Sequence, residues 1–263
     1  MGKLFVCDQR LLQVHSWLKH LARVPANVSK PLPEGVDAGT KTVAPACYTP
    51  RMSSRVILFD FDGVIADSLA AYFPVFVESC RDLGFAGPAT LEAFLDVFDT
   101  NAVKGLIKAG VPILKLRRLS KTLAPRVSEL NRQVLPFPGM PELVNRLTAR
   151  FPVYVVTSNV TSATEEFLAR HGITGLSGVI GSDQEASKVK KIRRIQRAHR
   201  GATPWYIGDT RGDMIEGRAA HAVTVAVTWG WHDRARLESG KPDHVVERVA
   251  DLAHLLHGDA DAF

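Results

Sequence analysis

The chain has 263 residues, of which 46% are hydrophobic and 23% charged, and its net charge is +6. This composition is typical of a globular protein with one large domain, or with one domain that carries an insertion. Apolar runs stay well short of the roughly 18 residues that a membrane-spanning helix needs, so the sequence excludes a membrane protein. The basic residues are spread along the chain without a nucleic-acid-binding motif, which predicts a solvated basic surface rather than a nucleic-acid site.

The three cysteines, Cys7, Cys47 and Cys80, are spaced like no zinc or redox motif. Free thiols are typical of a reducing compartment, so we expect a cytoplasmic protein. A disulfide between two of the three stays open as an alternative.

Residues 1–54 differ in composition from the rest and are expected to form an amino-terminal extension. Apolar residues from Leu4 to Leu21 recur at helical spacing, and a proline-rich stretch follows them. The first part predicts an amphipathic helix and the second part a flexible linker. Residues 10–24 are basic and free of acids, and Met52 stands just before the first expected strand. The extension is therefore open to three interpretations: an organelle-targeting segment, a flexible tail or an overlong gene start.

The most informative segment follows this extension. The apolar run Val56 to Phe59 predicts a buried strand, and it ends in Asp60 and Asp62 with Gly63 directly after them. Paired carboxylates disfavour each other's charged forms unless a cation lies between them. Mg²⁺ prefers such oxygen ligands, and open α/β sheets place their ligands at the carboxyl ends of their strands. The segment therefore predicts a metal-assisted site in which one carboxylate is free to act as a nucleophile.

Residues 68–136 are expected to form an all-helical insertion, because no strand pattern occurs between 69 and 135. The apolar pattern predicts one helix over 69–83, interrupted by Pro74, and a second helix that Thr90 caps. Prolines punctuate the rest of the insertion, since proline is unfavourable inside a helix. Three further helices are expected in the insertion, at about 100–109, 113–123 and 126–134, with Pro112 and Pro125 between them. A helix of the core is expected after the insertion, at 142–150.

Strands and helices alternate in the remainder of the chain. Ser162 and Glu165 have the spacing of a capping box for one helix, and Ser187 is expected to cap the next. Alternation of this kind implies a parallel sheet with right-handed crossovers, so the predicted fold class is α/β. The expected strands cover residues 153–157, 178–181, 205–209 and 223–227, and a further helix is expected at about 213–220.

Polar side chains follow each of these strands where the strand ends. Thr157 and Ser158 follow the second strand, Lys188 comes after the third, and Asp209 and Asp213 follow the fourth. In a parallel sheet these ends share one edge, so the side chains are expected to converge with the two aspartates of the first strand.

This ordered set resembles the haloacid dehalogenase (HAD) superfamily from Arg55 to about Leu256. The resemblance implies a Rossmann-like core over 55–67 and 137–263, with 68–136 as a helical cap. Val225–Gly230 looks like the last core strand and turn of phosphoglycolate-phosphatase-like members. The carrying motifs are Asp60-Phe-Asp-Gly-Val, Val-Val-Thr157-Ser-Asn, Ser187-Lys188 and Ile207-Gly-Asp209-Thr-Arg-Gly-Asp213.

The resemblance also implies roles for the individual residues. Asp60 would be the nucleophile that becomes an aspartyl phosphate, and Asp62 the general acid and then base. Mg²⁺ would be held by Asp60, the backbone carbonyl of Asp62 and Asp209, with Asp213 orienting its ligands; Mn²⁺ suits this oxygen set equally. The phosphate group would be bound by Thr157, Lys188 and the backbone near Gly63 and Ser158.

The second aspartate, Asp62, favours phosphoryl chemistry, because the dehalogenases of this superfamily lack it. We expect a phosphatase for a small phosphorylated metabolite, with 2-phosphoglycolate as the leading candidate. Two alternatives stay open: a sugar-phosphate mutase, in which Arg117 and Arg118 would hold a bisphosphate, and a non-catalytic phosphate-binding or partner-recruiting module. Trp229 and Trp231 are expected in the core or at its rim. The other basic residues of the helix that follows Ser187 are expected to form a solvated face: Lys190, Lys191, Arg193, Arg194 and Arg197.

Overall fold

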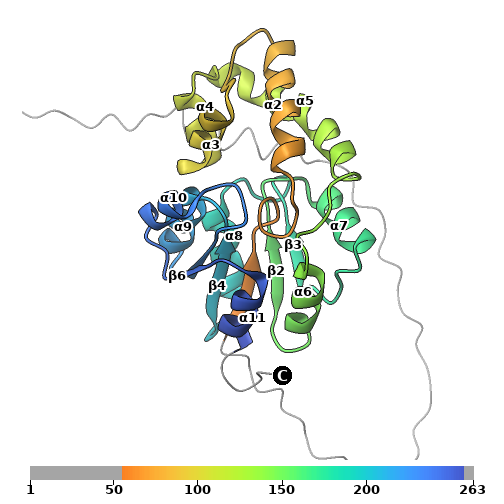
Figure 1. Cartoon of the computed structure of the whole chain (residues 1–263), viewed down its shortest axis with the longest axis vertical. Coiled ribbons are helices and arrows are strands. Elements are labelled where there is room, and N and C mark those ends of the chain that lie inside the picture. Colours follow the sequence, from red (N-terminus) through yellow and green to blue (C-terminus); the bar gives the residue numbers. More distant parts are fainter. Residues whose placement is uncertain (1–54, 258–263) are drawn as a thin grey trace, which may run out of the picture.

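The computed structural model describes residues 55–257, and a parallel sheet of six strands lies at the centre of this part. The strands occur in the spatial order β3-β2-β1-β4-β5-β6, so that β1 lies between β2 and β4 (Figure 1). Phe59 of β1 pairs with Val155 on one side and Ile207 on the other. The predicted α/β fold with a parallel sheet is confirmed. The strands are β1 (Arg55–Phe59), β2 (Val153–Val156), β3 (Gly178–Ile180), β4 (Thr203–Gly208), β5 (Val223–Val227) and β6 (His244–Val246).

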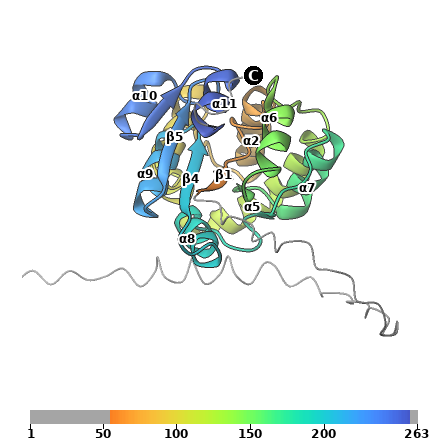
Figure 2. The same ribbon diagram turned by 90° about the horizontal axis from the view of Figure 1, so that it is seen from below.

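Strand β1 is apolar after Arg55 because helices cover both faces of the sheet. Val56 and Leu58 pack into a cluster that includes Ile192 of α8 (Lys188–Ala198). Ile57 and Phe59 pack on the opposite face against α6 (Met140–Thr148), α7 (Thr161–Arg170) and α11 (Val249–His257). These four side chains are fully buried. In the view along the strands, α8 lies on one side of the sheet, and α6 and α7 lie on the other side (Figure 2).

An inserted helical region separates β1 from β2 and lies over the carboxyl edge of the sheet (Figure 1). Its centre is Phe94, whose ring lies 5.0 Å from Phe76, 5.2 Å from Phe98 and 5.6 Å from Trp231 between ring centroids. Trp231 follows β5, so this aromatic cluster joins the insertion to the core. The exact domain boundaries stay a prediction. The helices of the region are α2 (Leu69–Asp82), α3 (Leu91–Asp96), the 3-10 helix η1 (Val97–Asp99), α4 (Ala102–Lys108) and α5 (Ile113–Leu130).

Two prolines that were expected to interrupt helices lie inside continuous ones. Helix α2 runs through Pro74, and α5 runs through Pro125, so the predicted break between 123 and 126 is wrong. An internal proline costs a helix about 3 kcal/mol or more. Both proline rings are exposed, while the facing sides of the two helices share a buried apolar cluster that includes Phe76 and Leu123. Tertiary packing offsets the local penalty.

The predicted capping box at Ser162 and Glu165 is also wrong. Helix α7 begins two residues earlier than predicted, at Thr161, and the side chain of the preceding Val160 makes no capping hydrogen bond. Instead, Asp183 from the loop after β3 accepts hydrogen bonds from the backbone and hydroxyl of Thr161, both at 2.8 Å. By contrast, the cap at Ser187 is confirmed, since its hydroxyl accepts from the backbone of Lys190.

The carboxyl-terminal part contains elements that the sequence pattern did not predict. Strand β5 is not the last strand of the sheet. It is followed by α10 (Arg234–Ser239) and then by β6. Strand β6 pairs with β5 in parallel, with Val225 opposite His244. With three residues, β6 is too short to produce a periodic signal. Helix α11 then covers the sheet and supplies the buried Leu252 and Leu256.

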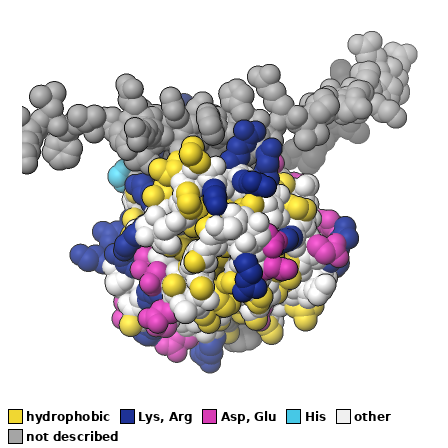
Figure 3. Space-filling view, turned by 90° about the horizontal axis from the view of Figure 1, so that it is seen from above, with side chains coloured by type: hydrophobic (Ala, Val, Ile, Leu, Met, Phe, Trp, Pro, Cys, Tyr) yellow, Lys and Arg dark blue, Asp and Glu magenta, His cyan; other side chains and the backbone are white. Residues whose placement is uncertain are grey.

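The predicted extension, with Cys7 and Cys47, lies outside the described residues. Cys80 of α2 is a buried free thiol. Within residues 55–257, no helix is both long and apolar enough to cross a membrane. Viewed from the side of the insertion, basic side chains occur in several separate places among apolar and acidic ones (Figure 3).

Candidate active site

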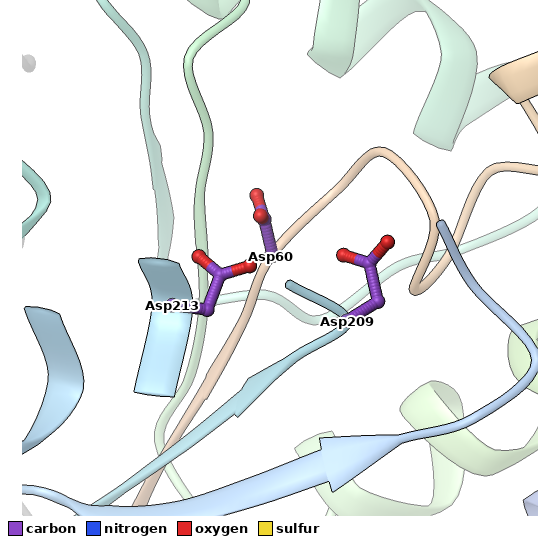
Figure 4. Close-up of side chains that lie close together, drawn as sticks. All are labelled: Asp60, Asp209 and Asp213. Atoms are coloured by element: carbon purple, nitrogen blue, oxygen red, sulfur yellow. The ribbon is translucent and has the colours of Figure 1, made fainter. Parts of the chain in front are cut away.

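The parallel arrangement of β1, β2 and β4 brings polar side chains together at one edge of the sheet. Asp60, Thr157 and Asp209 each follow the last residue of one of these strands. Asp213 lies in the first turn of α9 (Arg211–Ala219), and Lys188 is the first residue of α8. Carboxylate oxygens of Asp60, Asp209 and Asp213 all lie within 4.8 Å of one another (Figure 4). These side chains therefore converge at the edge of the sheet, as predicted.

Asp60 is held between a backbone amide and a lysine. Its Oδ1 accepts a hydrogen bond from the amide of Phe61 at 2.8 Å, and its Oδ2 accepts one from Nζ of Lys188 at 2.5 Å. Burial raises the pKa of Asp60 to about 7, although Lys188 opposes the shift. Burial alone would lower the pKa of Lys188, but Asp213 and Asp60 hold it well above its usual range. Lys188 therefore stays charged and fixes the orientation of the Asp60 carboxylate.

Asp213 uses both carboxylate oxygens in hydrogen bonds. Its Oδ1 accepts from Lys188 at 2.6 Å and from the hydroxyl of Tyr206 at 2.8 Å. Its Oδ2 accepts from the backbone and hydroxyl of Thr210, which completes a capping box at the start of α9. Burial would raise the pKa of Asp213, but Lys188, Thr210 and Tyr206 bring it below its usual range. One side chain thus caps the helix and anchors Lys188.

Asp209 has one carboxylate oxygen that accepts a hydrogen bond and one that does not. Its Oδ2 accepts from the backbone of Trp231 at 2.8 Å, whereas its Oδ1 is buried without a hydrogen-bond partner among residues 55–257. Burial, together with Asp213 and Asp60, raises the pKa of Asp209 well above its usual range. An unpaired buried carboxylate oxygen is costly unless something binds it.

Gly63 fits this position for steric reasons. Its φ is +74°, and a Cβ built on it would lie 1.8 Å from Oδ2 of Asp209. Its amide donates to the carbonyl of Ala66 at 2.9 Å. The N–H that was predicted to bind phosphate therefore already has a hydrogen-bond partner. The structural role of Gly63 is to let the loop after β1 pass beside Asp209.

Asp62 lies beside this group, outside the cluster of three carboxylates. Its Oδ2 accepts from the side-chain amide of Asn159 at 2.8 Å, and its Oδ1 is buried without a partner in the described part of the chain. Burial raises the pKa of Asp62 to about 6. A carboxyl group with a pKa near neutrality can both donate and accept a proton at physiological pH, which is what general acid–base catalysis requires.

The loop after β2 supplies the remaining predicted residues. Thr157 is fully buried, and its hydroxyl oxygen accepts from the backbone of Asn159 at 2.9 Å. Ser158 is exposed and lines a cavity that also reaches Asp60, Asp62, Lys188, Asp209 and Asp213, whereas Thr157 and Gly63 are not among its lining residues. The roles of Thr157 and Ser158 toward phosphate stay predictions.

Lys191 was expected on a solvated helix face, and this expectation is wrong. The side chain is fully buried, and its Nζ donates to the carbonyl of Thr157 at 2.5 Å. Burial and the nearby charge of Lys188 lower the pKa of Lys191 to about 8. Positions 188, 191, 192 and 195 fall on one helical face, and Ile192 and Ile195 are buried on it. The spacing from Lys188 is the signal that could have identified Lys191, and Asn159 was likewise missed as a partner of Asp62.

The donor set fits a divalent cation. Lys188 forms ion pairs with Asp60 and Asp213, and the carboxyl groups of Asp62 and Asp209 add two more acidic groups to the same site. Buried like charges of this number are unfavourable without a counter-ion. Hard oxygen donors are what Mg²⁺ prefers, and the unpaired Oδ1 of Asp209 is available to it. Fold and site together define an α/β enzyme organised around buried carboxylates at the edge of a parallel sheet.

The chain belongs to the haloacid dehalogenase-like hydrolases: the profile of that family matches residues 57–227, more than half of the sequence. A phosphoglycolate phosphatase of Synechococcus elongatus is 26% identical over 202 residues, which cover 75% of this chain and 95% of that protein. A pyrophosphatase PpaX of Oceanobacillus iheyensis is 25% identical over 228 residues, covering 80% and 100%. The solved structure of a haloacid dehalogenase-like hydrolase from Streptococcus pneumoniae has a TM-score of 0.64 at 21% identity, over 77% of this chain and 99% of that one. The predicted resemblance is confirmed, and the protein is a hydrolase of this superfamily.

Proposed function

We propose that the protein is a Mg²⁺-dependent phosphatase that hydrolyses a small phosphomonoester through an aspartyl phosphate at Asp60. The observation that carries the proposal is the arrangement around this carboxylate. It is oriented by the amide of Phe61 and by Lys188, it opens into the cavity, and Asp62 lies beside it with a partner of its own in Asn159. A nucleophile, a charge to bind phosphate and a proton donor are thus within one site.

In the first step, an oxygen of Asp60 attacks phosphorus, and the bond between phosphorus and the ester oxygen breaks. Asp62, whose pKa near 6 leaves a protonated fraction at neutral pH, donates its proton to the departing alkoxide. Lys188 attracts the phosphoryl oxygens as a point charge, and the Thr157 hydroxyl donates to one of them. Bound Mg²⁺, held by Asp60 and Asp209 with Asp213 alongside, would offset the repulsion between the anionic nucleophile and the anionic phosphate.

In the second step, Asp62 is a carboxylate and removes a proton from the water that attacks the aspartyl phosphate. The bond between phosphorus and the Asp60 oxygen breaks, and inorganic phosphate leaves with Asp60 restored. The side-chain amide of Asn159 donates a hydrogen bond of 2.8 Å to the Asp62 carboxylate and holds it in place. The same carboxyl group can therefore face the leaving group in the first step and the water in the second. Splitting the displacement in this way replaces one difficult step with two easier ones.

The names of the relatives supply the reference compounds. Phosphoglycolate phosphatases and pyrophosphatases are among them, so 2-phosphoglycolate and pyrophosphate belong in the first assay. A mutase would need cap cations for a bisphosphate; Arg117 lines the cavity, but Arg118 does not line it within the described residues. This observation favours a phosphatase over a mutase. A cytoplasmic location and a small phosphorylated metabolite as the partner are part of the same proposal.

The test is phosphate release from a panel of phosphorylated metabolites with Mg²⁺, with Mn²⁺ or with chelator. Asp60→Asn keeps the size of the side chain and its bond to Phe61 while removing the nucleophile. We expect metal-dependent release in the wild type and none in Asp60→Asn, with both proteins giving the same circular dichroism spectrum. Release at the wild-type rate from the variant, or release that chelator does not affect, would overturn the proposal.

A further inference from the structure

The cavity above the strand ends is much larger than a phosphate group needs. Its volume is about 690 Å³, which lies within the roughly 300–1,000 Å³ of pockets that bind drug-sized organic ligands. Its floor contains the catalytic carboxylates and Lys188. Its walls rise to the inserted helices α4 and α5, which therefore surround whatever group the phosphate is attached to.

These walls are mostly apolar. On α5, the lining residues Leu116, Leu119, Leu123 and Val127 recur at helical spacing, so that one face of the helix borders the cavity. Leu106 of α4 adds a further aliphatic side chain. Three aromatic side chains also line the cavity: Tyr72, Phe98 and Trp231.

Charge outside the catalytic group is sparse and does not favour an anion. Among the described residues that line the cavity, only Arg117 and Glu216 are charged besides the catalytic aspartates and Lys188. Arg117 is an exposed residue of α5. Glu216 of α9 is paired with a neutral group, the side-chain amide of Asn101, at 3.1 Å. A second anionic group on the substrate would therefore meet mostly apolar walls and the Glu216 carboxylate, with the exposed Arg117 as the one cation outside the catalytic group among the described lining residues.

We infer that the phosphomonoester processed here carries an extended, uncharged and apolar leaving group, an alkyl or aryl chain of about four or more carbons. The inference rests on the proposed phosphatase function and names its substrate class. A charged group placed among apolar side chains without a partner is strongly disfavoured, whereas an apolar chain gains from leaving water there. The glycolate part of 2-phosphoglycolate is short and anionic, so it matches neither the size nor the charge of the cavity.

The first experiment measures binding without chemistry. Alkylphosphonates keep the phosphate charge but lack the ester bond, so calorimetric titration of the full chain with ethyl-, butyl- and hexylphosphonate in Mg²⁺ isolates the contribution of the chain. Each methylene is expected to tighten binding about fourfold, hence about 250-fold for the four methylenes between ethyl and hexyl. The heat capacity change of binding should become more negative with chain length. Equal affinities across the series would overturn the inference.

The second experiment places the chain against α5. Leu116→Gln puts an amide on the apolar wall; Leu91→Gln makes the same change at an exposed position of α3 that does not line the cavity. We expect Leu116→Gln to weaken hexylphosphonate about tenfold and ethylphosphonate less than twofold, while Leu91→Gln changes neither. An equal loss for both phosphonates in Leu116→Gln would contradict the placement. The wild-type series does not depend on how well either variant folds.

The third experiment joins the inference to turnover and separates it from the proposed function. The kcat/KM for hexyl phosphate should exceed that for ethyl phosphate and for 2-phosphoglycolate by at least tenfold. Faster turnover of 2-phosphoglycolate than of hexyl phosphate would refute the substrate class while leaving a phosphatase. Chain-length-dependent phosphonate binding without release of phosphate from any ester would refute the phosphatase and leave the apolar binding site supported.

Discussion

Replacing Gly63 with alanine tests the steric argument for the active-site loop. The backbone there has a φ of +74°, which costs a residue with a Cβ about 1–2 kcal/mol. For a chain of this size, that corresponds to a fall in Tm of roughly 2–8 °C. The new Cβ would lie 1.8 Å from Oδ2 of Asp209, so one of the two must move by 3.4 − 1.8 = 1.6 Å to reach ordinary contact. A misplacement of about 1 Å in a catalytic site can lower the rate by about 100-fold.

Gly84 offers a matched control within the same chain. Its φ is +70°, and a Cβ built on it meets nothing within 4 Å. Gly84→Ala should therefore lose only the stability that the backbone strain costs, and it should keep its activity. We expect Gly63→Ala to lower kcat/KM at least about 100-fold and to require more Mg²⁺ for half-maximal activity, because Asp209 is displaced. Thermal melts and a Mg²⁺ titration of phosphate release measure both effects.

Equal kcat/KM values and equal Mg²⁺ requirements in the two alanine variants would refute the steric role of Gly63. Such a result would mean that the loop after β1 moves away from Asp209 without affecting the site. A loss of activity in Gly84→Ala equal to that in Gly63→Ala would also contradict the account, since it would assign the effect to backbone strain alone.

Three further predictions follow from the site and its surroundings. Asp62→Asn should lower the turnover of alkyl phosphates by about 10²–10⁴-fold, and p-nitrophenyl phosphate should give a burst of p-nitrophenol, because that leaving group needs no proton while hydrolysis of the aspartyl phosphate still does. Burial raises the pKa of Asp60 to about 7 and that of Asp62 to about 6. As pH rises through these values the two groups become charged in the folded protein, and the metal-free fold loses stability. Mg²⁺ should therefore raise Tm strongly at pH 8 but little at pH 5. Arg236→Gln removes ion pairs from α10 to Asp96 and Asp99 of the insertion and should raise KM severalfold, with a stability change below about 1 kcal/mol.

Each of these three has a result that would count against it. Steady turnover at the wild-type rate in Asp62→Asn would remove Asp62 from proton transfer. An equal Mg²⁺-induced rise in Tm at pH 5 and pH 8 would mean that the raised pKa values do not govern metal binding. For Arg236, the control is Arg248→Gln, which breaks an ion pair with Asp251 far from the insertion; equal KM values in the two variants would show that the contacts of α10 do not position the inserted helices.

The sheet and the convergence of the site were predictable because both depend on local patterns. A run of apolar residues ending in carboxylates predicts a buried parallel strand and a site at its end, and the structure has Asp60, Asp209 and Asp213 together there. The positions of polar residues on helices were harder to predict. Lys191 was assigned to the surface by its charge, but it is buried because it shares a helical face with Ile192.

The other errors came from long-range contacts that a local pattern does not contain. Helix α5 continues through Pro125 because it packs against α2, and α7 is capped by Asp183 from a loop after the next strand. The shape of the cavity also depends on long-range contacts, since its walls combine residues of α4 and α5 with Trp231 from the loop after β5. The substrate class therefore depends on the structure rather than on motifs.

The central claim is that Asp60 becomes covalently phosphorylated, and chemical trapping tests it most directly. Borohydride reduces an aspartyl phosphate to homoserine, so the enzyme can be quenched during turnover, reduced and digested, and the peptide that contains residue 60 analysed by mass spectrometry. We predict homoserine at position 60 in the wild type, more of it in Asp62→Asn, and none without substrate. Turnover without modification at Asp60, or trapping at a different carboxylate, would contradict the mechanism.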